Sequence, residues 1–180
     1  QLPHIELTRE IAHKFNSTYK EIFTEPEPLV GKVARLVGID GNAKMTKSLN
    51  NAIYLNETKD SLRQKIMSMY TDPSRIHATD PGETEKNPVF VYHRAFNSNL
   101  DEVKDLEERY QKGKVGDTEV KEKLFLALWD FLAPIQEKYA YYENHMEQVK
   151  EIMENGVKKT RNEVSQTMEL VRAVMKLNIV

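Results

Sequence analysis

Two long stretches of helical periodicity constrain the fold of this chain more than any other feature. Apolar and aromatic residues recur every three or four positions over residues 120–142 and again over residues 157–175. Residues at that spacing line one face of an α-helix, so two long amphipathic helices are expected. Pro134 should kink or end the first helix, and the second should follow Gly156. Together with shorter helices upstream, the pattern predicts a helical bundle.

The first forty residues have a more mixed character. Apolar spacing predicts a helix over residues 3–15, and a short, partly β-branched run predicts a strand over residues 33–37. The next five residues, Gly-Ile-Asp-Gly-Asn, are typical of a turn. Further helices are expected over 58–69, from an Asn87 N-cap to residue 96, and over 101–110. The fold class is therefore mainly α, with an α/β beginning.

Composition excludes several classes of protein. The chain has 180 residues, no cysteine and no apolar run long enough to cross a bilayer, so disulfides, thiolate zinc sites and membrane spans are not expected. These features favour a cytoplasmic protein. The net charge is −2, so any binding of RNA has to rely on a local basic patch rather than on the charge of the whole chain.

The loop over residues 41–52 carries the residues best suited to chemistry. Lys44 and Lys47 lie three positions apart in a turn rich in glycine and asparagine, with Thr46 and Ser48 beside them. Ammonium groups, hydroxyls and the backbone N–H groups of a turn can bind a polyphosphate. The alternative is an exposed basic turn without a function, which is the commoner explanation for two such lysines alone.

The surroundings of these lysines add a family resemblance. Residues 44–48, Lys-Met-Thr-Lys-Ser, resemble the KMSKS signature of class I aminoacyl-tRNA synthetases, with Thr46 in place of the first serine. Four flanking segments are similar, in order and spacing, to the tryptophanyl-tRNA synthetase family, namely residues 3–9, 67–73, 87–90 and 156–161. The resemblance extends over essentially the whole chain, and the tyrosyl-tRNA synthetases are the next most similar family.

The resemblance implies a domain organisation. Residues 1–43 would be the end of a Rossmann-type catalytic domain, 44–52 the KMSKS-type loop, and 53–180 an all-helical anticodon-binding region for tRNA. The sequence begins at Gln1 and lacks the family's other signature, the HIGH sequence of the ATP site. We therefore expect it to be the C-terminal portion of a longer enzyme, and the portion alone to be inactive.

The resemblance also implies an activity and a set of site residues. The family activates tryptophan with ATP, supplied with Mg²⁺, and transfers it to the 3′ end of its tRNA, and the full-length enzyme is a homodimer. Lys44 and Lys47 are expected to be catalytic, neutralising the departing pyrophosphate. No permanently bound metal is expected. The other expected contacts are Leu36, Val37, Met45, Thr46 and Ser48 with ATP, and Gln1 with substrate.

One other class of protein remains open. The chain could be a non-catalytic helical module that binds RNA or protein and retains a degenerate loop, although the presence of both lysines favours the enzyme. Trp129, Phe125 and Phe131 could stack on nucleic-acid bases, but their helical spacing favours a place in the core. A tyrosine cluster over residues 139–142 should have at least one exposed ring, and His93 is expected to be structural or solvated.

Overall fold

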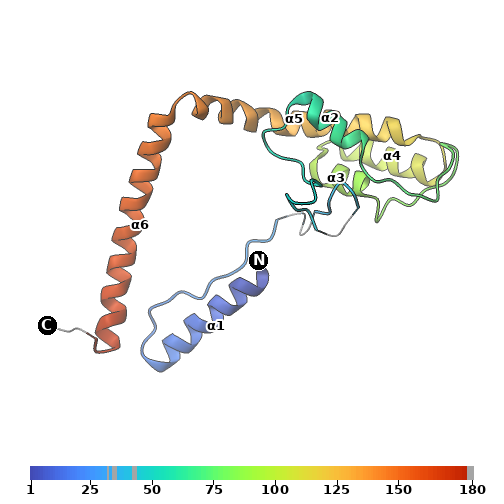
Figure 1. Cartoon of the computed structure of the whole chain (residues 1–180). Coiled ribbons are helices and arrows are strands. Elements are labelled where there is room, and N and C mark those ends of the chain that lie inside the picture. Colours follow the sequence, from blue (N-terminus) through green and yellow to red (C-terminus); the bar gives the residue numbers. More distant parts are fainter. Residues whose placement is uncertain (32, 34–35, 42–43, 178–180) are drawn as a thin grey trace. The chain divides into compact units, whose positions relative to one another are not determined.

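The computed structural model describes residues 1–31, 33, 36–41 and 44–177. Within these residues every regular element is a helix (Figure 1). The elements are α1 (Leu2–Thr18), α2 (Lys59–Met67), α3 (Pro88–Phe96), α4 (Leu100–Gln111), α5 (Asp117–Glu143) and α6 (Met146–Val174). Of the described helices, none combines the length and apolar character that crossing a membrane requires. The prediction of a mainly α chain is confirmed.

The chain forms two compact units. One contains residues 1–30 and 144–180, and the other contains residues 31–143. The second unit holds the hydrophobic core, in which α5 packs against α2 and α3, and α3 packs against α4. Figure 1 shows the three short helices gathered along the N-terminal part of α5. The side chains with the least exposure in this core are Leu62, Ile66, Phe90, Tyr92, Leu106, Tyr110 and Leu124.

Local capping explains where the short helices of this unit begin. The Thr58 hydroxyl accepts a hydrogen bond from the Ser61 N–H at 3.2 Å, at the start of α2. The Asn87 side chain accepts from the Val89 N–H at 3.0 Å, so the predicted N-cap of α3 is confirmed. Such bonds satisfy N–H groups that have no partner in the first turn of a helix.

The predicted strand over residues 33–37 does not form at the residues that can be checked. Val33, Leu36 and Val37 lie in irregular backbone, and residues 34–35 lie outside the described residues. A strand needs a neighbouring strand to pair its backbone groups, and the described part of the chain contains none. A β-branched run alone was therefore insufficient to predict a strand here.

Two helices extend past residues that were expected to limit them. Of the two effects predicted for Pro134, a kink or an end, the end does not occur, because α5 continues through the proline to Glu143. Proline has no N–H, so the Asp130 carbonyl, four residues before Pro134, loses its helical hydrogen bond. Both residues are exposed, so water can bond to that carbonyl instead. α6 begins at Met146 and runs through Gly156, because a glycine within a helix costs only about 1 kcal/mol relative to alanine.

Candidate functional site

The loop over residues 41–52, called the lysine loop below, lies in the second unit, between a tight turn and α2. The turn closes where the Gly41 N–H donates to the Gly38 carbonyl at 3.0 Å, and Gly41 has a φ of +82°, which glycine adopts without steric cost. The Ile39 N–H donates to the Asn51 carbonyl at 3.0 Å, so the two ends of the loop are joined. The predicted turn is confirmed for residues 38–41, and Asn42 lies outside the described residues.

The two lysines point away from the protein surface into solvent. Lys44 and Lys47 are both exposed, and among the described residues neither ammonium group has a hydrogen-bond or ion-pair partner. Within the same part of the chain the backbone N–H groups of Lys47 and Ser48 are also without an acceptor. The loop therefore offers two positive charges and two N–H donors that no described residue uses.

The remaining residues of the signature shape the turn. The Thr46 hydroxyl accepts a hydrogen bond from the Leu49 N–H at 3.3 Å and lies 3.4 Å from the Ser48 hydroxyl. The Asn50 N–H donates to the Lys47 carbonyl at 3.1 Å, with Asn50 at a φ of +50°. Met45 is half-buried against the hydrophobic core. Thr46 and Met45 thus hold the loop from inside, while Ser48 stays exposed.

The side chain that holds this loop together by hydrogen bonds is Asn51, which was not predicted from the sequence. Asn51 is only 1% exposed, and its side-chain oxygen accepts a hydrogen bond from the Thr46 N–H at 2.7 Å. Its amide nitrogen lies 3.0 Å from the Lys44 carbonyl and 3.0 Å from an Asp40 carboxylate oxygen. Nothing in the sequence distinguishes it from its neighbour Asn50, except that the apolar Ala52 and Ile53 follow, which is a weak signal of burial.

The segment after the loop is fixed by α2. The Lys65 ammonium donates to the Ala52 carbonyl at 2.9 Å and to the buried Glu57 carboxylate, and lies 4.5 Å from the centre of the Tyr54 ring. Burial raises the pKa of Glu57, but hydrogen bonds from Lys65, Ser61 and the Tyr54 N–H outweigh it, so that the pKa falls below its usual value of 4.5. Glu57 is therefore ionised and holds Lys65 in place.

Leu36 and Val37, the predicted adenosine contacts, lie beside the turn that precedes the loop. Both are half-buried against the core, and the Val37 carbonyl accepts a hydrogen bond from the Tyr92 hydroxyl at 2.8 Å. Burial, helped by the charge of Asp40, raises the pKa of Tyr92 to about 12, so the phenol stays protonated and donating. Gln1 belongs to the other unit, where it is exposed at the start of α1.

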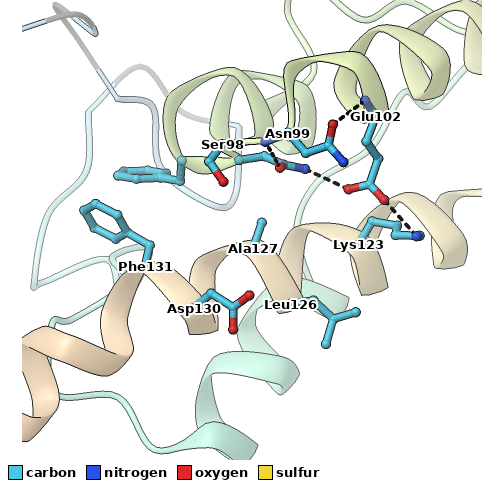
Figure 2. A pocket seen from close by; sticks show the side chains of 10 residues that line it. Ser98, Asn99, Glu102, Lys123, Leu126, Ala127, Asp130 and Phe131 are labelled. Carbon is cyan, nitrogen blue, oxygen red and sulfur yellow. Dashed lines mark hydrogen bonds and ion pairs between the residues drawn. The ribbon is translucent and has the colours of Figure 1, made fainter.

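A separate pocket of about 380 Å³ lies between the turn after α3 and the middle of α5 (Figure 2). Its polar side chains mainly satisfy one another. Asn97 donates to Glu102 at 3.1 Å. Glu102 also accepts from Lys123 at 2.8 Å, as a dashed line in Figure 2 shows. Phe131 on its rim is 44% exposed, so the prediction that this ring is in the core was wrong.

Chemically, the loop is suited to an anion with several negatively charged oxygens. Two mobile ammonium groups can follow charge as it moves, while backbone N–H groups and the Ser48 hydroxyl supply donors of fixed position. No cluster of three metal-ligating side chains occurs among the described residues.

Comparison with known proteins gives a consistent assignment. Residues 1–133 match the model of the family described as tRNA synthetases class I (W and Y). The tryptophan–tRNA ligase of Treponema pallidum is 48% identical over 175 residues, which are 97% of this chain and 52% of that protein. That of Borreliella burgdorferi is 54% identical over 160 residues, 88% of this chain and 46% of that protein.

A solved structure agrees with the sequence comparison. The structure of tryptophanyl-tRNA synthetase from Campylobacter jejuni, complexed with ADP and tryptophan, superposes with a TM-score of 0.73 and 32% sequence identity. The match covers 98% of this chain and 54% of that structure. The chain thus spans about half the length of the relatives that it matches.

Proposed function

Because this chain belongs to the family of class I tRNA synthetases for tryptophan and tyrosine, we propose that it is part of a tryptophan–tRNA ligase. The complete enzyme activates tryptophan with ATP and transfers it to the 3′ end of its tRNA. The relatives that are 48% and 54% identical carry this name, which favours tryptophan over tyrosine as the substrate.

In this proposal the chain contributes the later half of the enzyme. Residues 1–43 end the Rossmann-type catalytic domain, 44–52 form the KMSKS-type loop, and 53–180 form the helical anticodon-binding region. The full-length protein is a homodimer. The chain spans about half of its curated relatives, and the remaining half supplies the rest of the pocket for ATP and tryptophan.

The single observation that carries the proposal is the pair of unpaired ammonium groups on the loop. In the first reaction the tryptophan carboxylate attacks the α-phosphorus of ATP, and the bond to the bridging oxygen of pyrophosphate breaks. Negative charge accumulates on the departing pyrophosphate, so cations placed there stabilise the transition state more than the ground state. Lys44 and Lys47 are suited to this role because neither ammonium group forms an ion pair with another described residue.

The other predicted residues complete the nucleotide site in this proposal. Leu36 and Val37 contact the adenosine, and Met45, Thr46 and Ser48 contact ATP through the backbone and side chains of the loop. Gln1 contacts the amino-acid substrate. The Mg²⁺ ion is bound to ATP and enters the site as part of the substrate, and the loop does not hold it permanently.

ATP–pyrophosphate exchange tests the proposal. The full-length protein that contains this chain should exchange labelled pyrophosphate into ATP when tryptophan is present, and should charge its tRNA with tryptophan. Tyrosine in place of tryptophan serves as the matched control and should support far less exchange. Exchange that is equal with tyrosine would reject the substrate, and a full-length protein that exchanges with neither amino acid would favour the non-catalytic helical module.

A further inference from the structure

The Asn51 side chain holds the backbone on both sides of Met45. Its oxygen accepts from the Thr46 N–H at 2.7 Å, and its nitrogen donates to the Lys44 carbonyl at 3.0 Å. One buried amide therefore fixes the two peptide groups that flank Met45, between the two lysines. Lys44 is held at its own carbonyl, and Lys47 follows directly after the fixed peptide group of Thr46.

Asp40 fixes which way this amide faces. The Asn51 nitrogen lies 3.0 Å and 3.2 Å from the two Asp40 carboxylate oxygens. Carboxylate oxygens only accept hydrogen bonds when ionised, so the nitrogen has to face Asp40 and the oxygen has to face the Thr46 N–H. If the amide were rotated by 180°, its oxygen would face the Asp40 carboxylate and the Lys44 carbonyl, and its NH₂ group would face the Thr46 N–H.

Gly38 leaves the room that this arrangement needs. A Cβ at Gly38 would lie 2.3 Å from the Asn51 nitrogen and 2.5 Å from Asp40 Oδ1. Because both distances are far below van der Waals contact, any larger residue at position 38 would displace the amide. The turn, the carboxylate and the buried asparagine therefore form one device, to which the exposed lysines are attached.

We propose that Asn51 is a positioning residue for adenylate formation, which holds the backbone so that Lys44 and Lys47 project together toward the departing pyrophosphate. This inference rests on the proposed function. The lysine side chains are flexible, so they lose conformational entropy when their ammonium groups contact the phosphate groups. The loss is smaller when the backbone already directs both side chains toward the phosphates. Fixing that direction in advance lowers the cost of reaching the transition state, and a small misplacement lowers the rate.

The test uses tryptophan-dependent pyrophosphate exchange by the full-length protein. Asn51→Asp replaces the donor by an acceptor that faces the Lys44 carbonyl and Asp40, and should lower kcat about a hundredfold. The KM for tryptophan should stay within about twofold, because the Asn51 amide is buried and bonded to the loop backbone rather than open to a ligand. Asn56→Asp makes the same chemical change at an exposed asparagine outside the loop and should leave kcat unchanged.

A swap of the two partners separates positioning from general stability. In Asp40→Asn/Asn51→Asp the amide at position 40 donates to the carboxylate at position 51, but the Lys44 carbonyl still lacks its donor, so kcat should recover only in part. Thermal unfolding and a count of active sites are recorded for each variant, so that rates refer to folded enzyme. Should Asn51→Asp fail to fold, Gly38→Ala displaces the same amide without adding charge and should lower kcat in the same direction.

Each outcome discriminates. An Asn51→Asp enzyme with the kcat of Asn56→Asp, or a swapped enzyme as fast as the wild type, overturns the positioning role. A uniform loss of active sites with unchanged kcat per site assigns Asn51 to folding alone and also overturns it. A wild-type enzyme without any exchange rejects the proposed function instead, whatever the variants do.

Discussion

Gly38 illustrates how a single residue without a side chain determines the local structure of the loop. Its position meets the Asn51 amide so closely that alanine would force a displacement. We expect Gly38→Ala to lower the free energy of unfolding of the 180-residue chain by about 1–3 kcal/mol, as overpacking does elsewhere. Urea denaturation measures this, with Gly31→Ala as the control because nothing lies within 4 Å of a Cβ at Gly31. Equal midpoints for the two variants would contradict the close approach.

His93 gives a second prediction for a single residue. It is fully buried, with Nε2 2.9 Å from the Val120 carbonyl and Nδ1 3.2 Å from the Asn97 amide nitrogen. Nε2 therefore carries the proton and donates, while Nδ1 accepts, which is the neutral tautomer. Of the two alternatives expected for this histidine, structural or solvated, the burial agrees with the structural one.

The same burial makes stability depend on pH. Burial lowers the pKa of His93 below its usual 6.5, against the opposing effects of the Val120 carbonyl and of Glu102 and Glu107. The unfolded chain then binds the proton more readily than the folded chain, so stability is full above pH 6.5 and falls as the pH drops toward the folded-state pKa. We expect the free energy of unfolding, measured by urea denaturation between pH 5 and pH 7.5, to depend less on pH in His93→Gln than in the wild type. The same dependence on pH in both proteins would contradict this account.

At the scale of elements, a lysine of α5 satisfies the end of α2. The Lys121 ammonium is buried and donates to the Met67 carbonyl at 2.9 Å and to the Met69 carbonyl at 2.7 Å. A cation is favourable at the C-terminal end of a helix, where carbonyl groups lack partners. Burial lowers the pKa of Lys121, which shows that the surroundings are partly shielded from water.

Removing this contact should destabilise the core. We expect Lys121→Met to lower the free energy of unfolding by about 1–3 kcal/mol, since two carbonyl groups lose their donor and that of Met69 lies in a buried position. Lys138→Met changes an exposed lysine of the same helix and should have little effect. Urea midpoints compare the two variants, and a Lys121→Met chain as stable as Lys138→Met would show that the carbonyls find other partners.

The sequence predicted the helices better than their limits or their neighbours. Apolar spacing and the Asn87 cap identified the helices of the core because these signals are local. The strand over residues 33–37 could not be judged from its own residues, since strand formation depends on a partner elsewhere. α5 does not end at Pro134, one of the two effects predicted there, because the exposed carbonyl that loses its partner can bond to water. Gly156 was wrongly taken as a limit, because a glycine costs little enough for the surrounding helix to continue through it.

The loop shows the same difference within the candidate site. Lys44 and Lys47 were predicted as site residues from residue type, spacing and the family resemblance, and both are exposed, as a phosphate contact requires. Asn51 could not be recognised, because its role depends on the way Asp40 and the loop backbone fold around it. Residue types indicated the chemistry of the site, whereas the geometry that supports it required coordinates.

At the scale of the whole molecule, the chain spans about half of the relatives it matches, and we expect it to be inactive alone. The 180 residues contain the lysine loop but not the HIGH sequence, so the transition state would lack most of its contacts. Tryptophan-dependent pyrophosphate exchange should be undetectable with these residues and present with the full-length protein. Turnover by the isolated chain that equals the full-length protein would contradict this prediction.

The central claim is that Lys47, together with Lys44, neutralises the departing pyrophosphate. The most direct measurement is the single-turnover rate of tryptophanyl-adenylate formation by the full-length protein with Lys47→Ala. We expect the rate to fall about a hundred- to a thousandfold, as when one preorganised donor is removed from an active site. Lys104→Ala, at an exposed lysine of α4, should react at the wild-type rate. A Lys47→Ala enzyme that is as fast as Lys104→Ala would contradict the account.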